Sequence, residues 1–224
     1  MNEIVTKLES RLKAAQEKES LAISKAQKSF GDEEREEYFK SHQELLLAER
    51  DLARALNQEF AEPLDFPVKW DTGAPLPFLL QNEHKVFLTF YIQDSDPDWD
   101  GTYVNVVDPG SDVNVNLALV EFKSCTSTKF GSPNDEVLDG HPLEGKGLDS
   151  YTAQVVQNSS WIKEIQAINS VHSCYDPESW SNLKHYIFWF HDSTFECLAD
   201  SYSVEVHKTN MQVLLLKISN ELLK

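Results

Sequence analysis

Histidine side chains are the first candidates for chemistry in this sequence. His141, His172 and His191 come from three separate segments, and Glu196 follows the last of them closely. Imidazole beside a carboxylate or a thiolate can bind a metal ion or transfer a proton. No pair has HExxH, HxH or CxxC spacing, so a shared site depends on the fold bringing the residues together. The alternative is that these histidines lie at turns and strand ends and satisfy local hydrogen bonds.

An acidic segment offers a second candidate site. Asp96, Asp98 and Asp100 alternate along the chain before Gly101, which matches the opening of a calcium-binding loop. The glutamate that closes such a loop is replaced by Val107, and the flanking residues favour strands where an EF-hand requires helices. The segment therefore predicts either a site for a hard cation or an acidic turn between strands.

Residues 130–147 form a third stretch of interest, a long loop that contains His141. Loops of this length inside a compact domain are uncommon and often functional. We expect this loop to form the rim of any pocket in the domain. Its glycines lack the GxGxxG and GxxxxGK[ST] spacings, so no phosphate-binding motif is present; they are Gly131, Gly140, Gly145 and Gly147.

The three cysteines, Cys125, Cys174 and Cys197, are odd in number and lack CxxC spacing. This pattern favours reduced thiols in a reducing compartment. The first residues lack the apolar core of a secretory signal, and no apolar run approaches the roughly 20 residues that cross a bilayer. We therefore expect a cytoplasmic protein without a membrane contact. No cofactor is predicted.

The elements that must position these residues begin with a helical arm over residues 1–61. The arm is rich in Ala, Leu, Glu, Lys and Gln, and Gly31 followed by Asp32 marks the end of one helix and the start of the next. This pattern predicts an antiparallel helical hairpin that resembles a coiled coil. Small and apolar residues recur at steps of three and four along the first helix, which predicts a buried seam; they are Val5, Leu8, Leu12, Ala15, Ala22 and Ala26.

A proline-rich stretch, residues 62–77, follows the arm and predicts an extended linker, because proline and the residue before it both resist helix. The acidic remainder, residues 78–224, then alternates with a period of two, as strands do. The order ββββ-α-βββ-α predicts an α+β domain built on an antiparallel curved sheet or partial barrel. The predicted strands are 85–93, 102–107, 113–123, 151–157, 184–191, 194–199 and 202–207, and the predicted helices begin near Ser159 and span 209–223.

Two stretches of the C-terminal half carry a resemblance. His185–Cys197 reads HYIFWFHDSTFEC, and Gly140–Leu148 reads GHPLEGKGL. In these stretches the chain resembles an uncharacterised bacterial family with an HDSTFEC-type hairpin. The resemblance implies no activity and assigns no functional residues. The Asp192-Ser193 pair inside the first stretch is typical of a hairpin turn.

The net charge and its distribution along the chain indicate which classes of partner are expected. The net charge is −17, and residues 1–60 contribute only −3 of it, from ten basic and thirteen acidic residues. The remaining −14 belongs to a part of the chain with no arginine after Arg54, so direct nucleic-acid binding by that part is not expected. Such a field attracts a basic protein or a cation, and it also keeps a protein soluble.

These features lead to one hypothesis and two alternatives. The hypothesis is a non-enzymatic interaction or regulatory protein, in which the arm mediates self-association or docking and the acidic domain binds a protein partner. A basic protein is the candidate for that partner. The first alternative is a ligand-binding or metal-dependent enzymatic domain that uses the 130–147 loop with the candidate histidines and Glu196. The second alternative is an acidic inhibitor of a toxin or nuclease, of the kind found in immunity proteins.

Overall fold

The computed structural model describes residues 2–29, 31–71, 73–93 and 108–224. They form two compact units. The first unit comprises residues 1–62, 139–149 and 156–160, and the second unit comprises residues 63–138, 150–155 and 161–224. No helix in the described ranges is long and apolar enough to cross a membrane.

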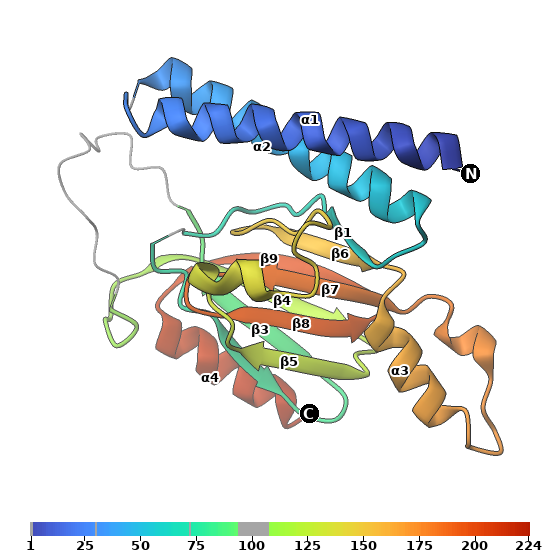
Figure 1. Ribbon diagram of the computed structural model, residues 1–224. Helices are drawn as coiled ribbons and strands as arrows, with labels where there is room; N and C mark the ends of the chain where they lie inside the picture. The colour runs from blue at the N-terminus through green and yellow to red at the C-terminus, as the bar shows by residue number, and fades with distance from the viewer. Residues whose placement is uncertain (1, 30, 72, 94–107) are drawn as a thin grey trace. The chain divides into compact units, whose positions relative to one another are not determined.

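Two long helices, α1 (Asn2–Ala26) and α2 (Asp32–Ala55), lie side by side in the first unit and form the predicted antiparallel hairpin (Figure 1). Ala15 and Ala22 of the predicted seam are buried, and Ala15 packs with Leu45 and Ala48 of α2. The seam is therefore confirmed, and the chain's own second helix covers it.

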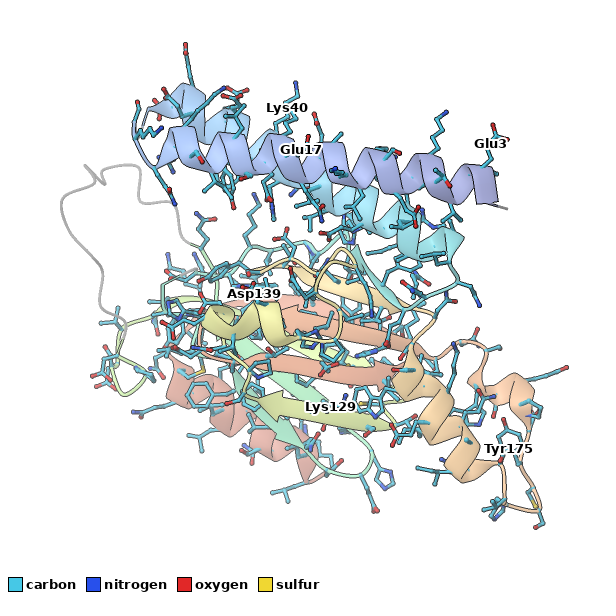
Figure 2. All side chains as sticks on the ribbon, in the orientation of Figure 1. Glu3, Glu17, Lys40, Lys129, Asp139 and Tyr175 are labelled. Carbon is cyan, nitrogen blue, oxygen red and sulfur yellow. The ribbon has the colours of Figure 1, made fainter. Side chains whose placement is uncertain are left out.

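Ion pairs between the two helices follow a heptad ladder. Lys18 Nζ lies 2.5 Å from Glu44 and Lys25 Nζ lies 2.7 Å from Glu37, and Arg11 with Asp51 forms a third rung at 2.6 Å. The rungs fall seven residues apart on each helix, in opposite directions, which is the repeat of an antiparallel coiled coil. Each exposed pair stabilises the hairpin by at most about 1 kcal/mol. Charged side chains such as Glu3, Glu17 and Lys40 project from this hairpin (Figure 2).

The strands form two antiparallel sheets, which confirms the predicted α+β class. The first sheet has five strands in the order β1-β6-β7-β8-β5, and the second has four in the order β2-β3-β4-β9. The strands of the two sheets stay separate, and the described residues contain no closed barrel. The strands are β1 (Phe60–Pro63), β2 (Phe78–Gln81), β3 (Val86–Tyr91), β4 (Val115–Lys123), β5 (Ser127–Gly131), β6 (Ala153–Gln157), β7 (Lys184–Trp189), β8 (Thr194–Ala199) and β9 (Ser201–Thr209).

The core of the second unit consists of aromatic and aliphatic side chains from the facing sides of both sheets. Phe90 and Phe122 come from the four-stranded sheet, and Phe188 and Phe195 come from the five-stranded one; all are at most 1% exposed. Full burial of such a side chain stabilises the fold by about 1.5–3 kcal/mol. The segment predicted as a linker also contributes to this core, because Trp70 is 3% exposed and stacks on Phe188 at 5.9 Å.

Helix α4 (Met211–Leu222) packs on the other face of the four-stranded sheet. Asn210 caps it by accepting a hydrogen bond from Val213 N at 2.9 Å, as expected for an asparagine before a helix. Met211, Leu214 and Ile218 share one face of the helix and are buried against the sheet. Within the second unit, α4, the four-stranded sheet and the strands β7, β8 and β5 of the five-stranded sheet are therefore successive layers. The remaining helices are α3 (Ser160–Asn169), η1 (Asp135–Gly140) and η2 (Pro177–Trp180).

Most predicted strands and both predicted helices of the β-rich part are present. The hairpin turn is confirmed, because β7 pairs with β8 and Phe190 N donates to Ser193 O at 2.9 Å. Strands β1, β2 and β5 were not predicted, because they are short and lack a clear period of two. The predicted strand at 102–107 lies outside the described residues.

Candidate functional site

The 130–147 loop brings a carboxylate to His191. Asp135 N donates to His191 O at 3.0 Å, and His191 Nδ1 lies 3.9 Å from Asp135 Oδ1 and 3.1 Å from Asp192 Oδ1. Tyr151 donates its hydroxyl proton to the second oxygen of Asp135. Burial and this hydrogen bond raise the pKa of Tyr151 to about 12, so the phenol stays protonated. The group places an imidazole that is 41% exposed beside two carboxylates, a combination of residue types that can transfer a proton.

Glu196 belongs to a different cluster, on the face of the five-stranded sheet opposite the sandwich core. Its carboxylate lies 2.8 Å from Nε2 of His185, a buried residue of β7, and 3.7 Å from Nζ of Lys129, its cross-strand partner in β5. Trp161 covers both, because its ring lies 5.1 Å from the His185 ring and 3.8 Å from Lys129 Nζ. Figure 2 labels Lys129 on β5. The tight packing points to a structural cluster that fixes α3 on the sheet.

The other two predicted histidines form local turn contacts. His141 Nδ1 accepts a hydrogen bond from Leu143 N at 3.2 Å, and His172 Nδ1 accepts one from Cys174 N at 3.1 Å. These are contacts of the kind that the alternative of turn histidines predicts. His141 belongs to the first unit, whereas His172 and His191 belong to the second.

No metal site emerges from the described ranges, where no three histidine, cysteine, aspartate or glutamate side chains are arranged to hold an ion. The acidic candidates Asp96, Asp98 and Asp100 lie outside the described residues. The site of His141, His172, His191 and Glu196, and the ligand-binding or enzymatic function built on it, stay predictions.

The helical hairpin carries a groove between the end of α1 and the start of α2. The groove measures about 480 Å³, within the range of about 300–1,000 Å³ that is usual for ligand pockets. Phe39 is its most prominent side chain and is 58% exposed. Most of the lining is apolar, and the residues are Ile23, Ala26, Gln27, Arg35, Tyr38 and Phe39.

A polar network behind the groove holds Tyr38 in place. The ring of Tyr38 stacks on the His42 ring at 5.8 Å. His42 Nδ1 lies 2.7 Å from Glu19 of α1, and His42 Nε2 lies 3.3 Å from Asp149. The hydrogen bond to Asp149 is the largest of the causes that raise the pKa of His42 from 6.5 to about 9, while burial opposes them. His42 is therefore charged at neutral pH and bridges three segments of the first unit.

This bridge predicts a pH dependence of stability. The folded pKa of His42 lies above its ordinary value, so its contribution is complete below about pH 6.5 and is lost as pH rises through about 9. The 2.5-unit difference corresponds to at most about 3 kcal/mol, and screening at a side chain that is 26% exposed reduces it. We expect the free energy of unfolding of the wild type to fall by about 2 kcal/mol between about pH 6 and about pH 10, relative to His42→Gln.

Urea unfolding followed by far-UV circular dichroism measures this difference. His84→Gln is the matched control, because His84 is 76% exposed beside Glu83, and its variant should follow the wild type at every pH. If His42→Gln also follows the wild-type pH profile, the His42 bridge does not contribute to stability.

Acidic residues flank the groove. The first two turns of α2 hold Asp32, Glu33, Glu34, Glu36 and Glu37 with Arg35 as the one cation among them. Lys25 of α1 pairs with Glu37, which leaves an excess of carboxylates beside the apolar lining. An apolar groove with an acidic border favours an occupant with apolar and basic side chains.

Comparison with known protein families, curated proteins and solved structures finds no match.

The groove residues were missed in the sequence, although one signal was present. The apolar spacing that ends with α1 resumes at Tyr38 in α2, which fits the half-buried position of Tyr38. Phe39 is the next residue and therefore faces away from the seam. A large aromatic residue on the polar side of an amphipathic helix could have indicated a contact surface.

Proposed function

We propose that this protein is a non-enzymatic protein-binding module whose helical hairpin holds a basic amphipathic helix of a partner protein. The observation that carries the proposal is the apolar groove beside Phe39. Phe39 contacts Tyr38, with 5.6 Å between the ring centroids, yet it stays 58% exposed beside a groove of about 480 Å³. A large apolar side chain that is exposed beside an apolar groove is a candidate contact residue for a partner.

A helical occupant fits the groove better than an extended strand. The groove lies between two antiparallel helices, and the side chains of a third helix can insert between the side chains that line it. Strand addition would instead require an exposed sheet edge. A helix anchors in such a groove through apolar residues three and four positions apart. Its basic residues would then face the carboxylates at the start of α2, where Asp32, Glu33 and Glu36 are exposed.

Charge also favours a basic partner over a second copy of the chain. Each copy carries a net charge of −17, so two copies repel one another before their apolar surfaces meet. The residues after position 60 carry a net charge of −14. This charge would attract a basic protein over a long range and raise its association rate at low salt.

A designed peptide tests the proposal on the full chain. The probe is a fluorescein-labelled amphipathic helix of about 18 residues with a leucine face and a lysine face, and its counterpart replaces every lysine with glutamate. We expect fluorescence anisotropy to show binding of the basic peptide that weakens as salt is raised. We expect Phe39→Ala to weaken this binding about tenfold or more, as for an anchor residue.

Leu21→Ala is the matched control, because Leu21 is also 58% exposed on the hairpin but does not line the groove. Its affinity should stay within about twofold of the wild type. The hairpin proposal fails if Phe39→Ala and Leu21→Ala bind equally, or if the basic peptide does not bind. Equal binding of the acidic peptide contradicts the charge preference. A wild-type dimer that Phe39→Ala converts to a monomer, seen by light scattering, assigns the groove to a second copy instead.

A further inference from the structure

Strand β9 forms one edge of the four-stranded sheet. It pairs with β4 along its whole length, from Ser201 opposite Lys123 to Thr209 opposite Val115. In the part of the chain that the structure describes, no segment other than β4 forms a backbone hydrogen bond with residues 201–209. The outer side of β9 therefore presents backbone groups to which another strand can bind.

The length of β9 distinguishes it from the edge strands β2 and β5 of the second unit. Proteins usually keep such edges short, cover them, or interrupt them with proline or a bulge. Strands β2 and β5 have four and five residues, and Thr128 of β5 donates to Gln81 of β2 at 2.8 Å. Strand β9 has nine residues without proline or glycine, in continuous register with β4. It therefore offers more backbone for pairing than either of them.

The hydrogen bonds of β4 show which residues of β9 direct their backbone groups outwards. Ile92 N, next to β3, donates to Asn116 O at 3.3 Å, so the even-numbered residues of β4 face β3 and the odd-numbered ones face β9. Odd-numbered residues of β4 lie opposite odd-numbered residues of β9. The even-numbered residues of β9 therefore direct N–H and C=O away from β4, and they are Tyr202, Val204, Val206 and Lys208.

Val206 marks the point where the apolar face of β9 leaves the core. Tyr202 and Val204 on the same face pack against the core of the second unit, but Val206 is 51% exposed. Apolar side chains that lie opposite one another on adjacent strands stabilise a sheet. An added strand with an apolar residue opposite Val206 would therefore cover it.

A polar hollow of about 270 Å³ lies on the other face of β9, between the sheet and α4. Two of its three carboxylates already have a close cation, because Glu121 lies 2.5 Å from Lys123 and Glu221 lies 2.6 Å from Lys224. The third carboxylate, Glu205, is the one that a partner can reach. The polar lining consists of Lys85, Glu121, Ser203, Glu205, Lys217 and Glu221.

Glu205 has room for a cation from a partner. Its side chain is 65% exposed, and its carboxylate lies 2.9 Å from His207 Nε2 but 3.8 Å from Lys217 Nζ. A carboxylate accepts up to about four hydrogen bonds. A lysine or arginine on an added strand, opposite Ser203 or Glu205, would therefore lie beside this carboxylate and the hollow.

We propose that β9 binds an extended segment of a partner protein, which joins the four-stranded sheet as an added strand and alternates apolar with basic residues. Its apolar side chains cover Val206, and its lysine or arginine side chains pair with Glu205 beside the hollow. Backbone hydrogen bonds supply the affinity of such a site, and the alternate side chains supply its specificity. The site belongs to the second unit, so it is distinct from the hairpin groove in the first.

A second copy of the chain is a poorer occupant of this edge. Two-fold symmetric pairing of β9 with itself keeps the same face of both strands on the same side of the sheet. The other copy's β9 then brings no lysine or arginine to the face with Glu205, because the residues on that face are Ser201, Ser203, Glu205, His207 and Thr209.

A labelled peptide tests the proposal on the full-length protein. The probe is a fluorescein-labelled peptide of nine residues, the length of β9, that alternates valine with lysine, and its counterpart replaces every lysine with glutamate. We expect fluorescence anisotropy to show that the lysine peptide binds at least about tenfold more tightly and that added salt weakens its binding. Glu205→Gln should weaken this binding about threefold or more. Glu83→Gln, at another exposed carboxylate, should leave it unchanged.

Methylation of the peptide's amide nitrogens tests the backbone pairing. Successive amides of a strand point in opposite directions, so methyl groups on one alternate set block pairing with β9 and those on the other set do not. We expect one of the two methylated peptides to lose binding at least about tenfold and the other to keep it. The proposal is wrong if both methylated peptides bind equally, or if the lysine peptide does not bind.

Variants of Val206 test the same pairing from the side of the protein. Val206→Pro removes one outward N–H and leaves the hydrogen bonds to β4 in place, as proline does at a sheet edge. We expect it to weaken binding of the lysine peptide about tenfold or more, and Val206→Ala, which keeps the N–H, to weaken it only about threefold. Equal effects of the two variants, with folding verified by circular dichroism, contradict strand addition. A wild-type dimer that Val206→Pro converts to a monomer, seen by light scattering, overturns the proposal and assigns the edge to a second copy. If Val206→Pro does not fold, the methylated peptides decide.

Discussion

Replacing Gly147 with alanine is expected to destabilise the first unit by about 3 kcal/mol or more. Gly147 has φ +80°, a conformation that residues with a Cβ avoid at a cost of about 1–2 kcal/mol. A Cβ there would lie 2.4 Å from Arg50 Cγ and 2.8 Å from Ala61 O. The carbonyl belongs to β1 and cannot move aside as a flexible side chain can, so the backbone of residues 139–149 must shift.

Two other glycines of residues 139–149 serve as controls, because they distinguish the effect of backbone conformation from the effect of close contacts. Gly145 also has a positive φ, +70°, but a Cβ would meet nothing within 4 Å. Gly145→Ala should therefore cost about 1 kcal/mol. Gly140 has neither restriction, so Gly140→Ala should leave stability unchanged within about 0.5 kcal/mol. Thermal unfolding by circular dichroism ranks the three variants, and equal effects at Gly147 and Gly145 would show that the close contacts are absent.

Replacing Arg50 with methionine is expected to cost about 3–5 kcal/mol. Arg50 is 8% exposed, and its guanidinium donates to Ala61 O at 2.9 Å and to Gly147 O at 2.8 Å. Methionine fills a similar volume but donates no hydrogen bond, so both carbonyls lose their charged donor. Gly147 N in turn donates to Glu49 at 2.9 Å, and burial is the main cause that raises the pKa of Glu49. Arg50→Met also removes the positive charge next to Glu49, and with it part of the electrostatic stabilisation of the buried Glu49 carboxylate.

Arg54→Met is the control for Arg50→Met. Arg54 lies one turn later on α2, is 52% exposed and pairs with Asp51 at 3.0 Å, so its replacement should cost at most about 1 kcal/mol. Urea unfolding of both variants measures the difference. The double variant Arg50→Met with Gly147→Ala should cost less than the sum of its parts, because both residues belong to one hydrogen-bonded network. Methionine also lacks the Nε atom that would lie 2.6 Å from the new Cβ. Similar losses at Arg50 and Arg54 would contradict the network.

The local parts of this fold were accessible from the sequence. The seam of α1 follows from apolar and small residues at steps of three and four, and Gly31 with Asp32 indicates where the hairpin turns. The turn at Asp192-Ser193 also sets the register of β7 and β8, which places Glu196 opposite Ile187 and near His185. The His185–Glu196 pair could thus have been derived, because antiparallel register follows from a known turn.

Contacts between distant segments were not accessible in this way. His42 and Asp149 lie 107 residues apart, and neither residue stands in a motif that indicates the other. Gly147 belongs to a predicted loop, and nothing in its neighbours shows that the chain there must pass beside Arg50. Such contacts depend on tertiary packing, which overrides local preferences. The division of the strands into two sheets has the same origin.

The first unit is assembled from pieces that are discontinuous in the chain, residues 1–62, 139–149 and 156–160. A single cut after Glu62 would therefore not release an intact helical module. Asp149, the partner of His42, and Gly147, the partner of Glu49 and Arg50, would stay on the other fragment. Recombination or gene fusion that moved the hairpin alone would leave the buried residues Glu49 and Arg50 without these partners. An intact hairpin therefore has to be transferred together with the segment around Gly147.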